Sequence, residues 1–348
     1  MQNRADAAAR DQKGGFLVIG PAWVGDMVMA QSLFITLKNR YPAQPIDVVA
    51  PAWSLPLLAR MPEVRRGIEL PVGHGELKLS QRLALGRSLR GAHYHQAIVL
   101  PRSFKSALIP WAAKIPHRVG FRGEMRYGLL NDIRPFDKAL LARTVQRYVA
   151  LGQPRGEALP PPTPYPELSV DSANQRVLIE KFGLSVDRPI VALLPGAEYG
   201  PAKRWPSEYF AALANQLNDK GYVCWVFGSK KEQELGAQIA SGAEGGVVNL
   251  VGRTELVDVI DLMALCSHAV TNDSGLMHIA AAVGIQVVAI YGSSSPDYTP
   301  PLTKRATIHV LELACSPCFE RDCRFGHNDC LRRISVDQVA ISVYSSLH

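Results

Sequence analysis

Short apolar runs rich in β-branched residues alternate along the chain with stretches of helical periodicity. GFLVIG (15–20), IDVVAP (46–51) and QAIVLP (96–101) end at Gly or Pro and predict buried strands of a parallel sheet. After the first of them, MVMAQSLFITLKNRYP has apolar residues at helical spacing and a terminal proline, which predicts a helix. The first half therefore predicts a doubly wound α/β domain of Rossmann type.

The same alternation begins again in the second half of the chain. RPIVALLPG (188–196), YVCWVFGS (222–229) and QVVAIYG (286–292) predict further strands. SEYFAALANQLNDKGY predicts a helix that begins at a Ser N-cap and ends before Gly221. A second Rossmann-like α/β domain is therefore expected, and ligands of such sheets bind at the carboxyl ends of the strands.

A proline-rich stretch without periodicity, GQPRGEALPPPTPYPEL (152–168), separates the two halves and predicts a linker. We expect a first domain over residues 1–165 and a second over residues 166–330. The final segment, 331–348, contains SVDQVAISVYSSL, which predicts an amphipathic helix.

The size of the chain agrees with two domains. It has 348 residues, of which 47% are hydrophobic and 20% charged, values typical of a globular protein. No apolar stretch approaches the ~18 residues of a membrane span. The opening MQNRADAAARDQKGG lacks the apolar core of a signal peptide, so a cytoplasmic protein is expected.

The net charge of +7 is unevenly distributed. Residues 1–165 hold 23 Lys and Arg against 11 Asp and Glu, whereas residues 166–348 hold 15 against 20. A basic first half indicates a polyanionic partner such as a phosphorylated lipid surface, a nucleic acid or an acidic saccharide. Ordinary solvated surface charge would give the same balance.

The loops that follow the predicted strands hold most of the unusual residues. No GxGxxG follows the first strand and no GxxxxGK[ST] is present, which argues against a dinucleotide oxidoreductase and against P-loop phosphoryl transfer. GPAKRWP (200–206) places two adjacent cations, Lys203 and Arg204, between prolines. Such a loop suits an anion, although an ordinary basic turn has the same composition.

Several long segments together resemble one known family. They are GPAWVGDMVMAQSL, GHGELKLSQR, LPRSFKSALIP, FRGEMRYGLLND, PGAEYGPAKRWP, TNDSGLMHIAAA and YGSSSPDYTPP, which extend from residue 15 to about residue 303. The chain resembles the ADP-heptose:lipopolysaccharide heptosyltransferases, which are glycosyltransferases of family 9. The resemblance implies a GT-B fold, in which two Rossmann-like domains face a central cleft. In such enzymes a C-terminal helix often crosses back to the first domain, and we expect this of residues 331–348.

The resemblance also implies a reaction and its partners. L-glycero-D-manno-heptose would move from ADP-heptose to the first heptose of heptosyl-Kdo-lipid A in the lipopolysaccharide inner core, with inversion and without a metal or other cofactor. A peripheral electrostatic contact with the cytoplasmic face of the inner membrane is expected, and no nucleic acid partner.

A glycosyl transfer requires a base near the acceptor hydroxyl and positive charge near the leaving diphosphate. Asp26 follows the first strand and is the candidate base, a role that the resemblance favours, although the same carboxylate could cap the next helix. Lys203 is carried over from the family as the phosphate ligand that neutralises the leaving group. Arg204 is assigned to the donor as well, or else turns outward to pair on the surface.

NDSGLMH (272–278) supplies the other expected donor contacts. A helix that begins at Ser274 and Gly275 offers backbone N–H groups and its dipole to a phosphate. The resemblance assigns Asp273 to heptose hydroxyls, and Ser274, Gly275 and His278 to the surroundings of the diphosphate. Alternatively, Asp273 and Ser274 cap the helix and His278 packs in the core. Other family members have an acidic residue for the ribose where this chain has Ser229 and Lys230, so Ser229 is only a substitute candidate for that contact.

The acceptor would carry carboxylates and phosphates, which arginine binds through two parallel hydrogen bonds. A cluster of basic residues in the first domain is therefore assigned to the acceptor, although each alone could be a surface charge; it comprises Arg102, Lys105, Arg118, Arg122 and Arg126.

Six cysteines complete the candidate chemistry. Cys315, Cys318, Cys323 and Cys330 follow a C-x2-C-x4-C-x6-C spacing, with His327 among them. This pattern allows a structural zinc site or four reduced thiols, because disulfides are rare in cytoplasmic proteins. The remaining two, Cys224 and Cys266, fall in strand and helix patterns and are expected in the core.

Three other functions remain compatible with the residues. One is a heptosyltransferase I-type addition to Kdo, and another is a non-catalytic GT-B protein that binds polyanions through its basic half. A third is a sugar-nucleotide epimerase or hydrolase, which consumes a donor without an acceptor.

Overall fold

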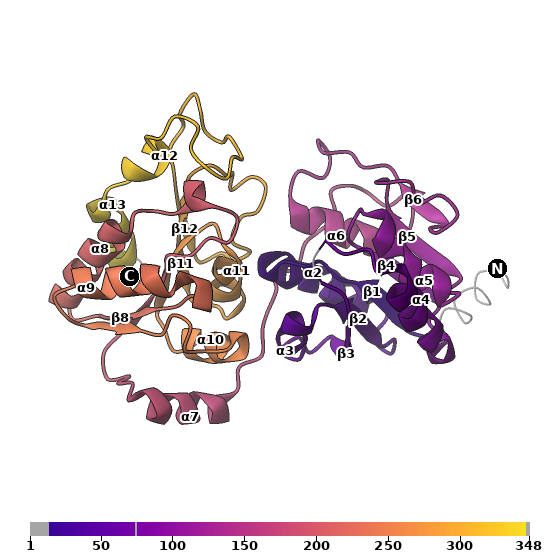
Figure 1. The fold of residues 1–348 in the computed structure, drawn as a ribbon, viewed down its shortest axis with the longest axis horizontal. Helices are drawn as coiled ribbons and strands as arrows, with labels where there is room; N and C mark the ends of the chain where they lie inside the picture. The colour runs from indigo at the N-terminus through magenta and orange to yellow at the C-terminus, as the bar shows by residue number, and fades with distance from the viewer. Residues whose placement is uncertain (1–13, 74, 346–348) are drawn as a thin grey trace. The chain divides into compact units, whose positions relative to one another are not determined.

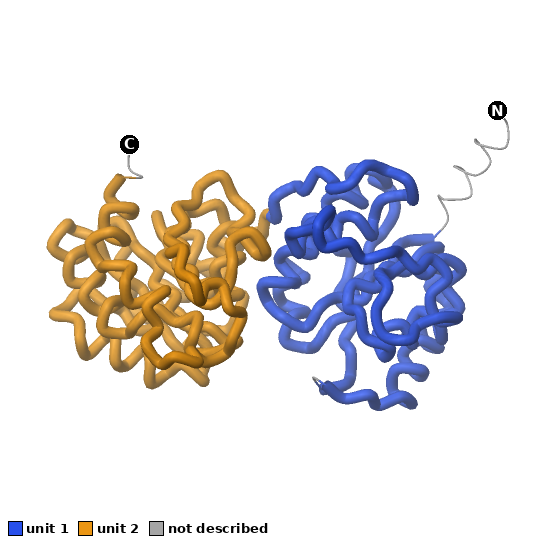
Figure 2. The backbone as a smooth tube through the Cα atoms, turned by 90° about the horizontal axis from the view of Figure 1, so that it is seen from above, with its two compact units in different colours: residues 1–166 blue, residues 167–348 orange. Residues whose placement is uncertain are grey.

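The structure is a computed structural model that describes residues 14–73 and 75–345 (Figure 1). The chain divides into two compact units, residues 1–166 and 167–348, close to the boundary predicted from the linker (Figure 2). The expectation about a signal peptide concerns the polar opening of the chain, of which residues 1–13 lie outside the described residues.

Unit 1 (residues 1–166) is built on a parallel six-stranded sheet with the order β3-β2-β1-β4-β5-β6. The pairing of Phe16 with Ile46 on one side and with Gln96 on the other fixes the register of the central strand. The strands are β1 (Phe16–Ile19), β2 (Ile46–Ala50), β3 (Val64–Glu69), β4 (Gln96–Val99), β5 (His117–Phe121) and β6 (Asp132–Arg134). The α-helices are α2 (Val24–Arg40), α3 (Leu55–Leu58), α4 (Leu79–Ser88), α5 (Leu108–Ala112) and α6 (Thr144–Gly152).

Unit 2 (residues 167–348) repeats this order as β12-β11-β10-β7-β8-β9, again with all strands parallel. Two doubly wound sheets of Rossmann order confirm the predicted α/β fold class. The strands are β7 (Ile190–Leu194), β8 (Val223–Val226), β9 (Val247–Asn249), β10 (His268–Asn272), β11 (Gln286–Tyr291) and β12 (Ala306–Val310). The α-helices are α7 (Ser172–Phe182), α8 (Ser207–Asp219), α9 (Gln233–Gly242), α10 (Leu256–Met263), α11 (Gly275–Ala282), α12 (Asp329–Arg332) and α13 (Val336–Tyr344).

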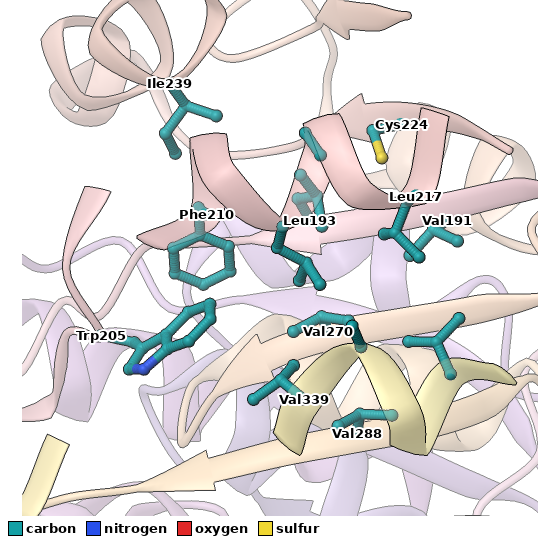
Figure 3. Close-up of a cluster of buried hydrophobic side chains, with 14 of the residues drawn as sticks. Val191, Leu193, Trp205, Phe210, Leu217, Cys224, Ile239, Val270, Val288 and Val339 are labelled. Atoms are coloured by element: carbon teal, nitrogen blue, oxygen red, sulfur yellow. The ribbon is translucent and has the colours of Figure 1, made fainter. Parts of the chain in front are cut away.

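The core of unit 2 lies between its sheet and the helices α8 and α13. Val191, Val270 and Val288 come from neighbouring strands and form one buried cluster with Phe210 and Leu217 of α8 (Figure 3). Burial of such side chains stabilises the fold by roughly 1.5–3 kcal/mol each.

The C-terminal helix packs in this same core. Val339, Ala340 and Val343 of α13 are fully buried, and Val339 faces the strands in Figure 3. The expectation that this helix packs on the first domain is therefore wrong. Its apolar face is already used by the sheet of the unit to which it belongs.

The helix α2, with 17 residues, packs against α6 in unit 1. The Ser32 hydroxyl on α2 donates to the carbonyl of Pro164 (2.6 Å), which ties the proline-rich linker to the unit. None of the helices within residues 14–73 and 75–345 has the length and apolarity needed to cross a membrane.

A buried carboxylate joins β2 to β3 in unit 1. Asp47 is fully buried and accepts hydrogen bonds from Arg65 (2.8 and 2.7 Å), Arg66 (2.8 Å) and the Tyr94 hydroxyl. Burial alone would raise the pKa of the Asp47 carboxyl, but these hydrogen bonds outweigh it and hold the pKa below its usual value.

We expect Asp47→Asn to lower the free energy of unfolding by about 2 kcal/mol at neutral pH, because hydrogen bonds to a charged carboxylate are lost. Since the folded-state pKa is lowered, the stabilisation is complete above about pH 4 and is lost as the pH falls through the folded-state pKa. Thermal unfolding followed by circular dichroism should thus show a difference between the two proteins that shrinks on acidification. Glu69→Gln, an exposed change in β3, is the control. A difference that did not vary with pH would contradict the assignment.

Candidate functional site

The donor-side residues of unit 2 lie where the strand order reverses. The strands β7 and β10 are the first and fourth strands of unit 2 along the chain, but they lie side by side in the sheet. Their carboxyl ends therefore form the topological switch point at which such sheets bind ligands. The loop 195–206 follows β7, and Asp273 follows β10 directly. The structure therefore brings together two motifs that are about seventy residues apart in the sequence.

An ion pair connects these two motifs. The Nζ atom of Lys203 lies 2.5 Å from Oδ2 of Asp273, and the side chains are 16% and 6% exposed. Thr299 donates to the other carboxylate oxygen of Asp273 (3.4 Å). The Lys203 ammonium also lies 5.1 Å from the ring centroid of Tyr199. The ammonium is thus held in place by a partly buried anion and an aromatic ring.

The side chain of Asn272 clamps the loop that carries Lys203. Its amide donates to the carbonyl of Pro195 (2.7 Å), and its oxygen accepts from the backbone N–H of Trp205 (3.0 Å). The buried Trp205 ring in turn donates through Nε1 to the carbonyl of Ile334 (3.0 Å) and packs against Phe210 (Figure 3). Both ends of the loop are therefore fixed, so Lys203 does not need to be ordered when a ligand binds.

The helix α11 begins beside this ion pair. Ser274 is its N-cap, but the hydroxyl makes no capping hydrogen bond, and Ser274 and Gly275 are only half-buried. The first N–H groups of a helix point outward and attract anions. The start of α11 can therefore receive a phosphate next to Lys203.

One turn further along α11, His278 is buried, and its Nδ1 has no hydrogen-bond partner among the described residues. Burial lowers the pKa of His278 to about 4, so the imidazole is neutral at pH 7. A buried polar atom without a partner is costly, and a bound ligand that supplied a hydrogen bond would remove this cost. The hydroxyls of Ser293 and Ser294, after β11, are buried without partners as well.

Two predicted donor residues make contacts within their own loops. The guanidinium of Arg204 donates to the carbonyl of Ala197 (3.1 Å) and is half-buried, so it stiffens the Lys203 loop instead of turning outward. Ser229 is exposed, and its hydroxyl donates to Glu232 (2.9 Å) in a capping box. Neither contact involves the ion pair.

Glu232 is a carboxylate that the sequence analysis did not select. It lies against Gly196 at the end of β7, where an added Cβ would stand 1.9 Å from its Oε1 atom. The signal was present in the sequence, because Ser229 and Glu232 have the spacing of a capping box, which places a Glu three residues after a Ser N-cap. The glycine that follows a buried strand is required by this close approach.

In unit 1 the switch point lies between β1 and β4. Asp26 is half-buried in the first turn of α2, after β1, and the N-cap of this helix is Trp23. After β4 come Arg102, which is exposed, and Lys105, which is half-buried. The Arg102 guanidinium stacks 4.3 Å above the centroid of the Phe136 ring and donates to the carbonyl of Arg122, a third basic residue that is exposed.

The other two basic residues assigned to the acceptor lie elsewhere. Arg126 is 2% exposed and donates to the carbonyls of Pro101 (2.7 Å) and Phe121, and burial lowers its pKa to about 10. Arg118 lies at the amino end of β5 and donates to the carbonyls of Leu129 (2.6 Å) and Ile115 (2.5 Å). These two guanidinium groups are occupied by backbone carbonyls and hold loops together, so they are not free to bind an acceptor.

All six cysteines are free thiols. Cys224 and Cys266 are buried as expected, and burial raises the pKa of Cys224 to about 12. Cys315, Cys318, Cys323 and Cys330 are half-buried. Across the described part of the chain, no group of three or more His, Cys, Asp or Glu side chains is arranged to hold a metal ion.

Residues 82–328 match the family model of glycosyltransferase family 9 (heptosyltransferase). Lipopolysaccharide heptosyltransferase 2 of Salmonella typhimurium is 48% identical over 340 residues, 95% of this chain and 98% of that protein. The solved structure of E. coli ADP-heptose lps heptosyltransferase II aligns with a TM-score of 0.86 at 45% identity, over 96% of this chain and 98% of that chain. Lipopolysaccharide heptosyltransferase 1 of Pseudomonas aeruginosa is 28% identical over 39% of this chain and 38% of that protein.

We expect Lys203→Met to lower the free energy of unfolding by about 3 kcal/mol, because Asp273 is left as a buried carboxylate without a cation. Adding Asp273→Asn should recover part of this loss, since the uncompensated charge is then removed. Lys231→Met is the matched control, because the pair of Lys231 with Glu198 is exposed and should contribute less than about 1 kcal/mol. Urea titrations of the four proteins measure these differences. Equal losses in Lys203→Met and Lys231→Met would show that the first pair is not a buried one.

Proposed function

The chain belongs to glycosyltransferase family 9, the heptosyltransferases, and we propose that it moves L-glycero-D-manno-heptose from ADP-heptose onto the first heptose of heptosyl-Kdo-lipid A. The chain is a glycosyltransferase by its family. The observation that carries the proposal is the ion pair of Lys203 and Asp273 at the start of α11. A cation, a carboxylate and the N–H groups at the start of a helix lie together at one switch point, which supports the proposal.

On the donor side, the diphosphate of ADP-heptose binds at the start of α11 and next to Lys203. When the bond between the anomeric carbon and the diphosphate breaks, its electron pair leaves with ADP and negative charge grows on the phosphate oxygens. The Lys203 ammonium and the N–H groups near Ser274 and Gly275 stabilise this charge, an effect worth about 3 kcal/mol for one such contact. Asp273 binds heptose hydroxyls, and the neutral His278 donates or accepts one hydrogen bond near the diphosphate.

For the adenosine ribose we propose Glu232 in place of Ser229. The hydroxyl of Ser229 is already bonded to Glu232, whereas the carboxylate can accept further hydrogen bonds from ribose hydroxyls. The close approach of Glu232 to Gly196 keeps it beside the loop that carries Lys203.

On the acceptor side, Asp26 removes the proton of the attacking heptose hydroxyl. The oxygen then attacks the anomeric carbon from the face opposite to ADP, which inverts the configuration. Asp26 lies half-buried in the first turn of α2, where the helix dipole favours a negative charge. No metal or other cofactor takes part in these steps.

Arg102, Arg122 and Lys105 bind the carboxylates and phosphates of the acceptor. We further propose that unit 1 contacts the inner-membrane surface from the cytoplasmic side, with no nucleic acid partner. Large aromatic side chains are exposed on the same unit, among them Trp111 (48%) and Tyr127 (69%), and exposed aromatic side chains suit a lipid interface.

The alternatives fit the observations less well. The relative named heptosyltransferase 2 aligns over nearly the whole chain, and the one named heptosyltransferase 1 over 39% of it, which favours addition to heptose over addition to Kdo. A polyanion-binding protein would not need the carboxylates Asp26 and Asp273 at the switch points. A hydrolase or epimerase would not need exposed basic residues after β4 and β5.

The proposal is tested by measuring ADP release from ADP-heptose with heptosyl-Kdo-lipid A, with Kdo-lipid A, and without acceptor. We expect release only with the heptosylated acceptor, and a fall of about 10² to 10⁴ in Asp26→Asn, because a general base is lost. Glu157→Gln, which removes only an exposed pair with Arg40 near the other end of α2, should retain the rate. Release without acceptor would indicate a hydrolase or epimerase, and release with Kdo-lipid A alone an addition to Kdo. Acceptor binding without any release would contradict an enzymatic function.

Substitution of the exposed arginines tests whether they bind the acceptor directly or act only as ordinary surface charge. Arg102→Gln and Arg122→Gln should each raise the KM for the acceptor by about tenfold, the effect of one charge-assisted contact. The KM for ADP-heptose should not change. Arg87→Gln, an exposed substitution on α4, is the control for net charge. If it raised the KM for the acceptor equally, the two arginines would act only through the overall field.

A further inference from the structure

The segment between β12 and α12 lacks a hydrophobic core of its own. Residues 311–328 form no helix or strand, and none of residues 311–330 is fully buried. The segment is drawn in yellow around α12 in Figure 1. Loops longer than about 12–15 residues without secondary structure are uncommon in compact domains, because ordering each residue costs about 1–2 kcal/mol. Hydrogen bonds to neighbouring loops hold part of this segment, among them those from the Ser316 hydroxyl to the carbonyl of Gly292 (2.7 Å) and from the N–H of Phe319 to the carbonyl of Ser293 (2.7 Å).

Four cysteine side chains line one cavity within this segment. Cys315, Cys318, Cys323 and Cys330 surround a space of about 20 Å³, and His327 and Arg324 also line it. A volume of this size admits one water-sized body and no organic ligand. All four thiols are free, so no disulfide crosses the cavity.

The backbone turns tightly between the third and the fourth cysteine. The N–H of Gly326 donates to the carbonyl of Cys323 (2.9 Å), and the N–H of Leu331 donates to the carbonyl of Asn328 (2.9 Å). Cys323 and Cys330, on either side of this turn, line the same cavity.

We propose that Cys315, Cys318, Cys323 and Cys330 bind one divalent, thiolate-preferring metal ion, Zn²⁺ or Fe²⁺. The four thiols release four protons and supply four sulfur ligands, the tetrahedral set that selects these ions over Mg²⁺ or Ca²⁺. In the present arrangement the side chains line the cavity without meeting at one point, so binding turns the thiols toward its centre. His327 is not needed as a ligand, because its Nδ1 accepts a hydrogen bond from the backbone N–H of Asp329 (2.9 Å).

A metal ion bound in this segment would also affect the loop that carries Lys203, because the segment contacts that loop. The backbone N–H of Ala202 donates to the carbonyl of Arg321 (3.0 Å), and the Tyr199 hydroxyl donates to the carbonyl of Phe319 (2.6 Å). Both contacts join the cysteine segment to the loop that carries Lys203. The four cysteines are therefore positioning residues, and the metal ion holds the support of the Lys203 loop in place. This consequence rests on the proposed function, whereas metal binding itself does not.

Metal content tests the proposal directly. The full chain is purified in chelator-free buffer, and zinc and iron are measured by inductively coupled plasma mass spectrometry. We expect about one ion per chain, and which element is found decides between the two metals. Cys318→Ser and Cys323→Ser should lose the ion, and the control Cys266→Ala, which alters a buried thiol outside the cavity, should retain it. A chain that contains neither metal after growth with both would overturn the proposal.

Thiol reactivity of the wild-type chain provides a second readout that does not depend on the folding of the variants. The four thiols should react slowly with a thiol reagent in the native chain and faster by at least about tenfold after chelation. Re-addition of Zn²⁺ should restore the protection. Thiols equally reactive before and after chelation, or a disulfide found by mass spectrometry, would refute metal binding.

The same samples separate this inference from the proposed function. Chelated protein should bind ADP several-fold more weakly than metal-loaded protein, because the Lys203 loop has lost its support. If the metal is present and chelation leaves ADP binding unchanged, the site exists but does not position Lys203, and that step of the inference is wrong. If the metal-loaded chain binds no ADP at all, the proposed function fails while the metal site stands.

Discussion

The ion pair of Lys203 and Asp273 is the contact on which the arrangement of the donor side depends. A carboxylate that is 6% exposed is stable only with a cation beside it, so the loop from β7 must fold over the end of β10. Asn272 enforces this closure by bonding to both ends of the loop. A charged side chain is thereby held at the switch point of the sheet, and little reorganisation is required when an anion arrives.

The loop that carries Lys203 is supported on two sides, by the buried core on its inner side and by a less buried segment on its outer side. Trp205 anchors the loop in the apolar core, where burial alone is sufficient. The outer side of the loop contacts residues 311–330, which have no core. Hydrogen bonds to this loop order the segment in part, and the metal ion proposed for the four cysteines that line its cavity would add a cross-link.

The sequence predicted the parts of the molecule that depend on local patterns. Buried parallel strands are continuous apolar runs, so both sheets and the loops at their carboxyl ends could be located, including those of Asp26, Lys203 and Asp273. The partner of α13 could not be predicted, because amphipathic periodicity shows that one face is buried but not against which sheet. The fate of Arg118 and Arg126 was equally hidden. Each is held by carbonyls that become neighbours only after β5 and the following loop have folded.

Since some of these arginines are used in folding, only part of the positive charge of the first half is available to bind an anionic partner. Arg65 and Arg66 share the one carboxylate of Asp47, and Arg118 and Arg126 are occupied by carbonyls, so part of the excess positive charge serves the folding of the unit. Arg102 and Arg122 remain exposed at the carboxyl end of the sheet. The positive charge of these arginines attracts anions to this edge. Asp26, in the first turn of α2, is a carboxylate at the same edge. It repels a phosphate but not a neutral hydroxyl group. In the function proposed above, this edge would orient the acceptor with its anions toward the arginines and its hydroxyl toward the carboxylate.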